Sequence, residues 1–133
     1  MTLVDSNILI DVWSNDSHWA AWSTAQLAAA SDRGPIVVNP IILAELVGRF
    51  AEESDLLSVL SQAGVRRVAL PIAAAWPAAR AFALYQKRGG TRSATLPDFF
   101  IGAHAQVEDW PLLTRDPKRY RTYFPKVKLI APK

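Results

Sequence analysis

Four acidic residues that lie far apart in the chain occupy comparable places beside predicted strands and helices. Asp5 ends the first apolar run, and Asp116 follows a later one. Asp98 opens a predicted helix, and Glu45 lies about one turn into another. Ligands of an open parallel sheet bind beyond the carboxyl ends of its strands. We therefore expect Asp5, Asp98 and Asp116 to reach that edge of the sheet directly, and Glu45 to join them if its helix leans over the sheet.

Such a cluster of carboxylates has an electrostatic requirement. Neighbouring negative charges raise one another's pKa values unless a cation neutralises them. Oxygen ligands without histidine or cysteine favour Mg²⁺ or Mn²⁺ over zinc, and the sequence contains no cysteine. An ion held by carboxylates and water suits phosphodiester hydrolysis, because it activates a water and stabilises charge on the phosphate.

Each acid also has a simpler explanation when it is taken alone. Asp98 and Asp116 favour helix N-termini through charge–dipole interaction. Glu45 interrupts the apolar residues 41–47, so it is either the one exposed position or an inward-facing functional group. Asp5 is the sharpest case, because an uncompensated charge between a buried strand and an apolar helix would be expensive.

The elements that must position these acids alternate between strands and helices. The predicted strands are continuous apolar runs at residues 2–5, 36–38, 65–70, 112–114 and 127–130. The predicted helices span residues 6–12, about 16–31, 40 onward, 54–64, an Ala-rich stretch to about 88, and about 98–107. This pattern indicates an α/β fold whose mostly parallel sheet of about five strands lies between helical layers. The length of 133 residues suits a single domain, 1–133.

Composition limits the classes of protein that the chain can represent. Half of the residues are hydrophobic, which is enough for a substantial core. No stretch approaches the roughly 20 apolar residues of a membrane helix, and no signal peptide is recognisable. The absence of cysteine fits a reducing cytoplasm, which is the location we expect.

Basic residues gather toward the end of the chain, although the net charge is only +3. This region faces either RNA phosphates or, as the simpler reading, solvent. Arg115 has a further alternative, an ion pair with the neighbouring carboxylates. The candidates for phosphate contacts are Arg92, Arg115, Lys118, Arg119 and Arg121.

Several other polar and aromatic residues receive structural interpretations. We expect His104 to be packed and hydrogen-bonded rather than catalytic, and His18 to lie at the surface. We expect Asp11 and Asp16 to occupy exposed helix ends. The five tryptophans, Trp13, Trp19, Trp22, Trp76 and Trp110, are interpreted as packing residues.

Four segments together resemble the motifs of PIN domains, and in particular of VapC-like toxins of type II toxin–antitoxin systems. Each segment carries one of the acids, and their order and spacing match across nearly the whole chain. The segments are residues 3–9 (LVDSNIL), 39–46 (NPIILAEL), 96–105 (LPDFFIGAHA) and 113–120 (LTRDPKRY).

The resemblance implies a three-layer α/β/α domain with Mg²⁺- or Mn²⁺-dependent endoribonuclease activity on structured RNA, notably tRNA. Carried over by position, Asp5, Glu45, Asp98 and Asp116 are the catalytic, metal-holding acids. The resemblance also implies a small cognate antitoxin that covers the active cleft, and a homodimer. Asn7 and Thr114 match polar positions that support the site.

Two other classes of function remain open from the sequence. A metal-dependent phosphatase could use Asp5 as its nucleophile, although the strand ends offer no clear phosphate-binding lysine. A non-catalytic RNA- or protein-binding module could share the same fold. Composition does not separate RNA cleavage from DNA cleavage.

Overall fold

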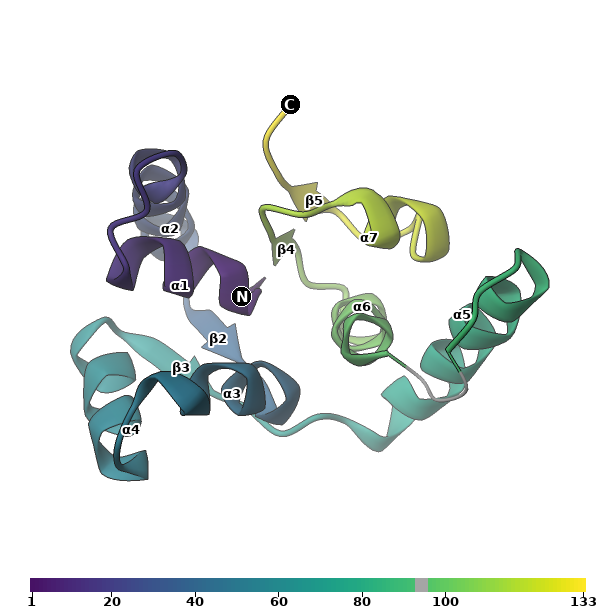
Figure 1. The fold of residues 1–133 in the computed structure, drawn as a ribbon, viewed down its shortest axis with the longest axis horizontal. Coiled ribbons are helices and arrows are strands. Elements are labelled where there is room, and N and C mark those ends of the chain that lie inside the picture. The colour runs from purple at the N-terminus through teal and green to yellow at the C-terminus, as the bar shows by residue number, and fades with distance from the viewer. Residues whose placement is uncertain (93–95) are drawn as a thin grey trace.

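The computed structural model describes residues 1–92 and 96–133 of the chain. Its centre is a five-stranded sheet of order β3-β2-β1-β4-β5, and every pairing between neighbouring strands is parallel (Figure 1). The strands are β1 (Thr2–Val4), β2 (Ile36–Val38), β3 (Val65–Arg67), β4 (Leu112–Leu113) and β5 (Leu129–Ile130). The predicted α/β/α fold is confirmed, although four of the five strands are shorter than predicted.

Helices follow the strands and surround the sheet. They are α1 (Ser6–Trp13), α2 (Ala20–Arg33), α3 (Pro40–Leu46), α4 (Glu53–Gln62), α5 (Ala75–Lys87), α6 (Pro97–Glu108) and α7 (Lys118–Tyr123). Short 3₁₀ turns span Val47–Arg49 and Ile72–Ala74. Helix α7 was not predicted, because it is shorter than two turns and rich in charged and aromatic residues.

Local capping explains where two of the helices begin. The Asn39 side chain accepts a hydrogen bond from the backbone N–H of Ile42 at 3.0 Å, and Pro40 opens α3 as predicted. Helix α2 starts later than predicted. The Asp16 side chain instead accepts the backbone N–H groups of His18 (3.1 Å) and Trp19 (2.7 Å), which stabilises a turn before the helix.

The strand order creates a reversal point between β1 and β4. The chain first adds β2 and β3 on one side of β1, and then returns through α5 and α6 to place β4 on the other side. The backbone N–H of Asp5 donates to the carbonyl of Leu113 at 2.9 Å, so the ends of these two strands are joined. Such a reversal opens a crevice at the carboxyl edge, where α/β proteins bind their ligands.

The core is built around the central strands and α6. Leu3, Val37 and Leu112 are fully buried, and α6 is buried at Phe99 and at every residue from 101 to 105. Helix α6 contacts α3, α5 and α7, which explains its burial on several sides (Figure 1). None of the described helices has the length and apolar character needed to cross a membrane.

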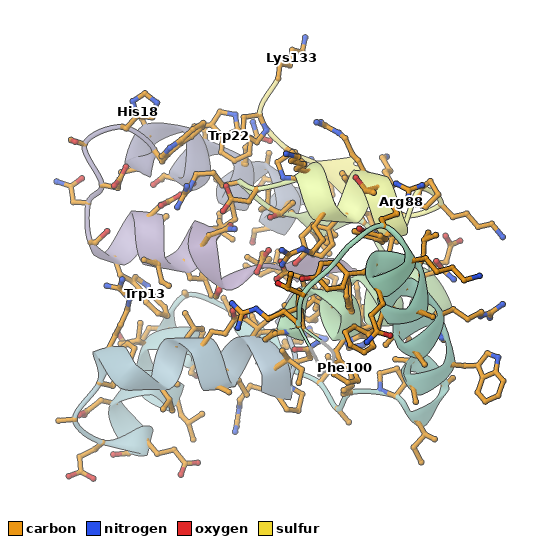
Figure 2. The ribbon with its side chains drawn as sticks, turned by 45° about the vertical axis from the view of Figure 1, so that its right-hand side comes forward. Trp13, His18, Trp22, Arg88, Phe100 and Lys133 are labelled. Carbon is orange, nitrogen blue, oxygen red and sulfur yellow. The ribbon has the colours of Figure 1, made fainter. Side chains whose placement is uncertain are left out.

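The tryptophans differ in how far the core covers them. Trp13 and Trp22, which are labelled in Figure 2, and Trp110 pack against the core as predicted. The Trp13 ring lies edge-on to that of Phe50, with 5.4 Å between the ring centroids. The prediction was wrong for Trp76, which is 72% exposed near the start of α5. Its place in an Ala-rich helix gave no periodic signal to distinguish the outer face from the inner one.

Gly102 provides a test of this packing. A Cβ atom at Gly102 would lie closer to the Phe124 ring than real contacts allow, whereas Gly48 has open space around its Cα. We expect Gly102→Ala to lower the free energy of unfolding by about 1–3 kcal/mol through overpacking, despite the better helix propensity of alanine. Urea unfolding beside the control Gly48→Ala measures this. Equal stabilities of the two variants would contradict the close packing of α6 on Phe124.

Candidate active site

Asp5 lies at the reversal point and caps α1. Its Oδ1 accepts the backbone N–H of Ser6 at 2.9 Å. Its Oδ2 accepts hydrogen bonds from the hydroxyls of Thr114 (2.9 Å) and Tyr120 (3.0 Å). Burial, opposed by these hydrogen bonds, raises the pKa of Asp5 from 3.8 to about 6. Asp5 is therefore a rigidly held carboxylate that is costly to ionise.

Tyr120 joins Asp5 to Asp98. Its hydroxyl lies 3.0 Å from Asp5 Oδ2 and 3.3 Å from Asp98 Oδ1, and the residue is almost fully buried. Burial and the negative charges of Asp5 and Asp98 raise the pKa of Tyr120 well above 10, so the hydroxyl stays a donor. Tyr120 was not predicted as a site residue, although it ends the fourth matched segment.

Glu45 reaches the same place from α3. The hydroxyl of Ser6 donates to its Oε1 at 3.3 Å. Although Glu45 is an exposed residue, partial burial of its carboxyl group, followed by the charges of Asp5 and Asp98, raises its pKa to about 6. Glu45 is therefore an exposed residue, as Ala44 and Val47 are. Its carboxyl group lies within electrostatic reach of Asp5 and Asp98.

Asp116 stands at the rim of this cluster, with its side chain 72% exposed. The Asn7 amide connects it to the site, because Nδ2 lies 3.4 Å from both Asp116 Oδ2 and Thr114 Oγ1. The backbone N–H of Arg115 donates to Asn7 Oδ1 at 3.1 Å, and that of Asp116 donates to Thr114 Oγ1 at 3.2 Å. Asn7 and Thr114 thus tie the loop after β4 to α1.

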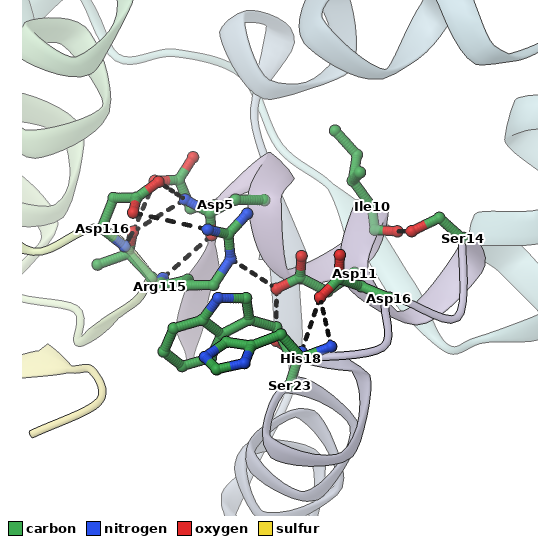
Figure 3. Close-up of polar contacts among 12 residues, drawn as sticks. Asp5, Ile10, Asp11, Ser14, Asp16, His18, Ser23, Arg115 and Asp116 are labelled. Carbon is green, nitrogen blue, oxygen red and sulfur yellow. Dashed lines mark hydrogen bonds and ion pairs between the residues drawn. The ribbon is translucent and has the colours of Figure 1, made fainter.

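Arg115 and Asp11 form a partly buried ion pair beside the cluster. Arg115 Nε lies 2.9 Å from Asp11 Oδ2, which also accepts the Ser23 hydroxyl at 2.8 Å (Figure 3). The guanidinium also lies 5.5 Å from the centre of the Trp19 ring and 3.8 Å from Asp116 Oδ1. The prediction of an exposed Asp11 was wrong, because only 2% of it is exposed. A lone acid on an amphipathic helix carries no signal of a partner about a hundred residues away.

The structure confirms the predicted environments of the two histidines, one packed and one at the surface. His104 is buried at 1% exposure, and its Nδ1 lies 3.0 Å from the Asn39 amide nitrogen. Burial lowers the pKa of His104, which fits a neutral, packed imidazole. His18 is exposed.

The remaining predicted phosphate contacts are divided between a pocket and the open surface. Lys118 and Arg119 line a pocket of about 520 Å³ beside Asp98 and Asp116. Arg119 Nη1 lies 3.2 Å from Asp98 Oδ2. Arg92 and Arg121 are exposed and lie outside the lining of this pocket.

The acids offer the oxygen ligands of a divalent-cation site, but in the described residues they are not arranged as a complete coordination site. Within the described part of the chain, no three His, Asp or Glu side chains are arranged as a ready metal cluster. Burial is the main cause of the raised pKa values of Asp5 and Glu45, and repulsion from the charge of Asp98 adds to it in both. A hard cation would relieve that repulsion, and the ligands on offer are all oxygens. The donor set therefore fits Mg²⁺ or Mn²⁺ once the side chains close around it.

The pH dependence of stability provides a test of the environment of Asp5. Between pH 7 and pH 5, folded Asp5, with a pKa of about 6, takes up a proton, whereas the unfolded group near 3.8 stays ionised. The contribution of Asp5 to the free energy of unfolding therefore increases as pH falls. We expect wild type to gain about 1 kcal/mol relative to Asp5→Asn over this interval, because the variant lacks this titration and also lacks the Asp5 charge that raises the pKa of Glu45. Urea unfolding in EDTA measures it, and parallel pH profiles would contradict the raised pKa.

Tyr120→Phe tests the link between the two acids. Removing the hydroxyl removes one hydrogen bond that lowers the pKa of Asp5, so the carboxylate becomes harder to ionise at neutral pH. We expect about tenfold weaker Mn²⁺ binding by calorimetry, with circular dichroism unchanged. Unchanged affinity in a folded variant would show that the bridge does not support the acids.

Comparisons with known proteins agree with this geometry. The family model described as the PIN domain matches residues 2–125. No curated protein sequence matches the chain.

Solved structures share the fold. The VapBC2 complex of Rickettsia felis, bound to a promoter DNA fragment, matches with a TM-score of 0.75 at 18% identity, covering 99% of this chain and 98% of that chain. VapBC-1 from nontypeable Haemophilus influenzae matches with a TM-score of 0.74 at 18% identity, covering 98% of this chain and 96% of that chain. A toxin–antitoxin complex from Klebsiella pneumoniae matches with a TM-score of 0.63 at 26% identity, covering 100% of this chain and 98% of that chain. Because the family model spans nearly the whole sequence, this chain belongs to the PIN domain family.

Proposed function

We propose that this protein is a Mg²⁺- or Mn²⁺-dependent endoribonuclease and the toxin of a toxin–antitoxin pair. The observation that carries the proposal is the placement of Asp5 at the reversal point, where Tyr120 links it to Asp98. Burial, followed by negative neighbours, raises the pKa values of Asp5 and of the nearby Glu45. Membership of the PIN family supports it, because PIN domains are generally nucleases that use divalent metals.

In this proposal, Asp5, Glu45, Asp98 and Asp116 hold the cation. A cation held there would activate a water and stabilise negative charge on the scissile phosphate. Hydrolysis would then leave a 5′-phosphate on the downstream fragment and a 3′-hydroxyl on the upstream fragment. Thr114 and Tyr120 donate to Asp5 and favour its ionised form. Asn7 orients Asp116 through the contact at 3.4 Å.

The partners follow from the solved neighbours. Their printed names describe toxin–antitoxin complexes, so a small antitoxin that covers the acidic cleft is the partner we propose. Structured RNA, with tRNA as the first candidate, is the proposed substrate, and a homodimer is the proposed assembly. These assignments rest on similarity of fold together with the site described above.

The rival readings have less support from the geometry. A phosphatase nucleophile needs a carboxylate oxygen open to the phosphorus, but Asp5 is only 5% exposed and both of its oxygens accept hydrogen bonds. A purely binding module has no need for buried carboxylates that are costly to ionise.

Sequencing of RNA 5′ ends tests the proposal. Wild type incubated with total tRNA and Mg²⁺ should give defined new ends, and Asp98→Asn should lower the cleavage rate on the order of a hundredfold or more. Asp109→Asn is the matched control. It changes an exposed acid at the far end of the same helix, in a left-handed conformation that asparagine tolerates.

Metal removal completes this experiment. EDTA should abolish cleavage by wild type, and excess Mg²⁺ or Mn²⁺ should restore it. Identical 5′ ends from wild type and Asp98→Asn, or cleavage that persists in EDTA, would contradict the proposal.

A further inference from the structure

A pocket of about 520 Å³ opens beside the acidic cluster, between α5 and α7. Asp98 and Asp116 form its border with the candidate active site, and Tyr85 and Tyr123 form an aromatic wall. We propose that this pocket binds the nucleotide next to the scissile phosphate, with an unpaired base against the tyrosines. The inference rests on the proposed nuclease function and adds a substrate-binding site to it.

The aromatic wall is held in place by the core. Both tyrosine rings pack edge-on against the buried Phe99, with centroid distances of 5.6 Å for Tyr85 and 5.3 Å for Tyr123. The two tyrosine rings lie 6.2 Å apart. The backbone of Gly90 packs so close to Tyr85 that a Cβ atom there would overlap the ring. A wall fixed before binding loses little conformational entropy when a base contacts it.

The charges around the pocket favour a nucleotide over a simple anion. Lys118 is exposed at the pocket and can reach a phosphate, and Arg88 lies 5.8 Å from the centre of the Tyr123 ring at the end of α5 (Figure 2). Arg119 is engaged with Asp98. Two carboxylates in the same wall would repel an isolated anion, whereas a neutral base avoids this repulsion and its phosphate can turn toward Lys118.

The position of the pocket identifies which nucleotide it would hold. Two of its lining residues, Asp98 and Asp116, are proposed metal-holding acids, so a ligand in the pocket directly adjoins the reacting phosphate. The volume lies within the range of small-ligand sites. Proteins read RNA mainly through unpaired bases placed against aromatic side chains, which is the chemistry that this wall offers.

Thr122→Trp tests the proposal by filling the pocket. Thr122 is exposed on α7, lines the pocket, and uses its hydroxyl only for a 2.9 Å bond to the Lys118 carbonyl within the helix. The indole should therefore enter the pocket without disturbing the core. Ala83→Trp is the matched control, because it adds the same group at an exposed position of α5 outside the pocket lining.

Binding is measured by fluorescence anisotropy with labelled hexauridine and hexaadenosine in Mg²⁺. A Glu45→Gln background slows cleavage without touching the pocket. We expect Thr122→Trp to weaken binding about tenfold and Ala83→Trp to leave it near the background value. In the otherwise wild-type protein, Thr122→Trp should raise KM more than it lowers kcat. Lys118→Gln, which leaves the pocket open, should weaken binding and reduce its salt dependence.

The outcomes separate the two proposals. If wild type cuts RNA but Thr122→Trp and Lys118→Gln bind as tightly as Ala83→Trp, the pocket assignment is wrong and the nuclease proposal stands. If wild type neither binds these probes nor cuts tRNA, both proposals fail. Selective weakening by Thr122→Trp and Lys118→Gln supports the pocket.

Discussion

The burial of a carboxylate beside other negative charges is the constraint on which this structure depends. Asp5 is nearly buried between the ends of β1 and β4, and the charges of Asp98 and Glu45 act on the same region. Burial and negative neighbours each disfavour ionisation, so the fold holds the acids at a cost in free energy. A divalent cation held by these acids would offset that cost, because it would remove the repulsion between them.

Hydroxyl groups keep the arrangement ordered before any cation binds. Thr114 and Tyr120 donate to Asp5, Tyr120 also approaches Asp98, and Ser6 donates to Glu45. Hydrogen bonds to carboxylates are stronger than those between neutral groups, so each hydroxyl offsets part of the burial cost. These hydroxyls come from α1, from the residue after β4 and from α7, so the acids are positioned by three separate parts of the fold.

The Asp11–Arg115 ion pair holds a further buried carboxylate beside the cluster. Asp11 of α1 holds Arg115, which adjoins Asp116, while Ser23 of α2 donates to Asp11. Removing one partner of such a buried pair would leave a charge without compensation. The loop that carries Asp116 is therefore anchored to two helices on one side, while its carboxylate faces the open pocket on the other.

The sequence by itself determined the alternation of strands and helices and the parallel sheet, because apolar runs and helix-start signals are local properties. It also indicated that His104 is packed, and the structure confirms this. The roles of the four acids and of Asn7 and Thr114 stay predictions from the four matched segments, although the structure describes the contacts of Asn7 and Thr114. Only the tertiary structure decided that Tyr120 bridges two acids, that Asp11 is buried against Arg115, and that Tyr85 and Tyr123 border the acids. These contacts join residues that are distant in the chain, and such residues meet only when packing brings their elements together, so no local pattern records them.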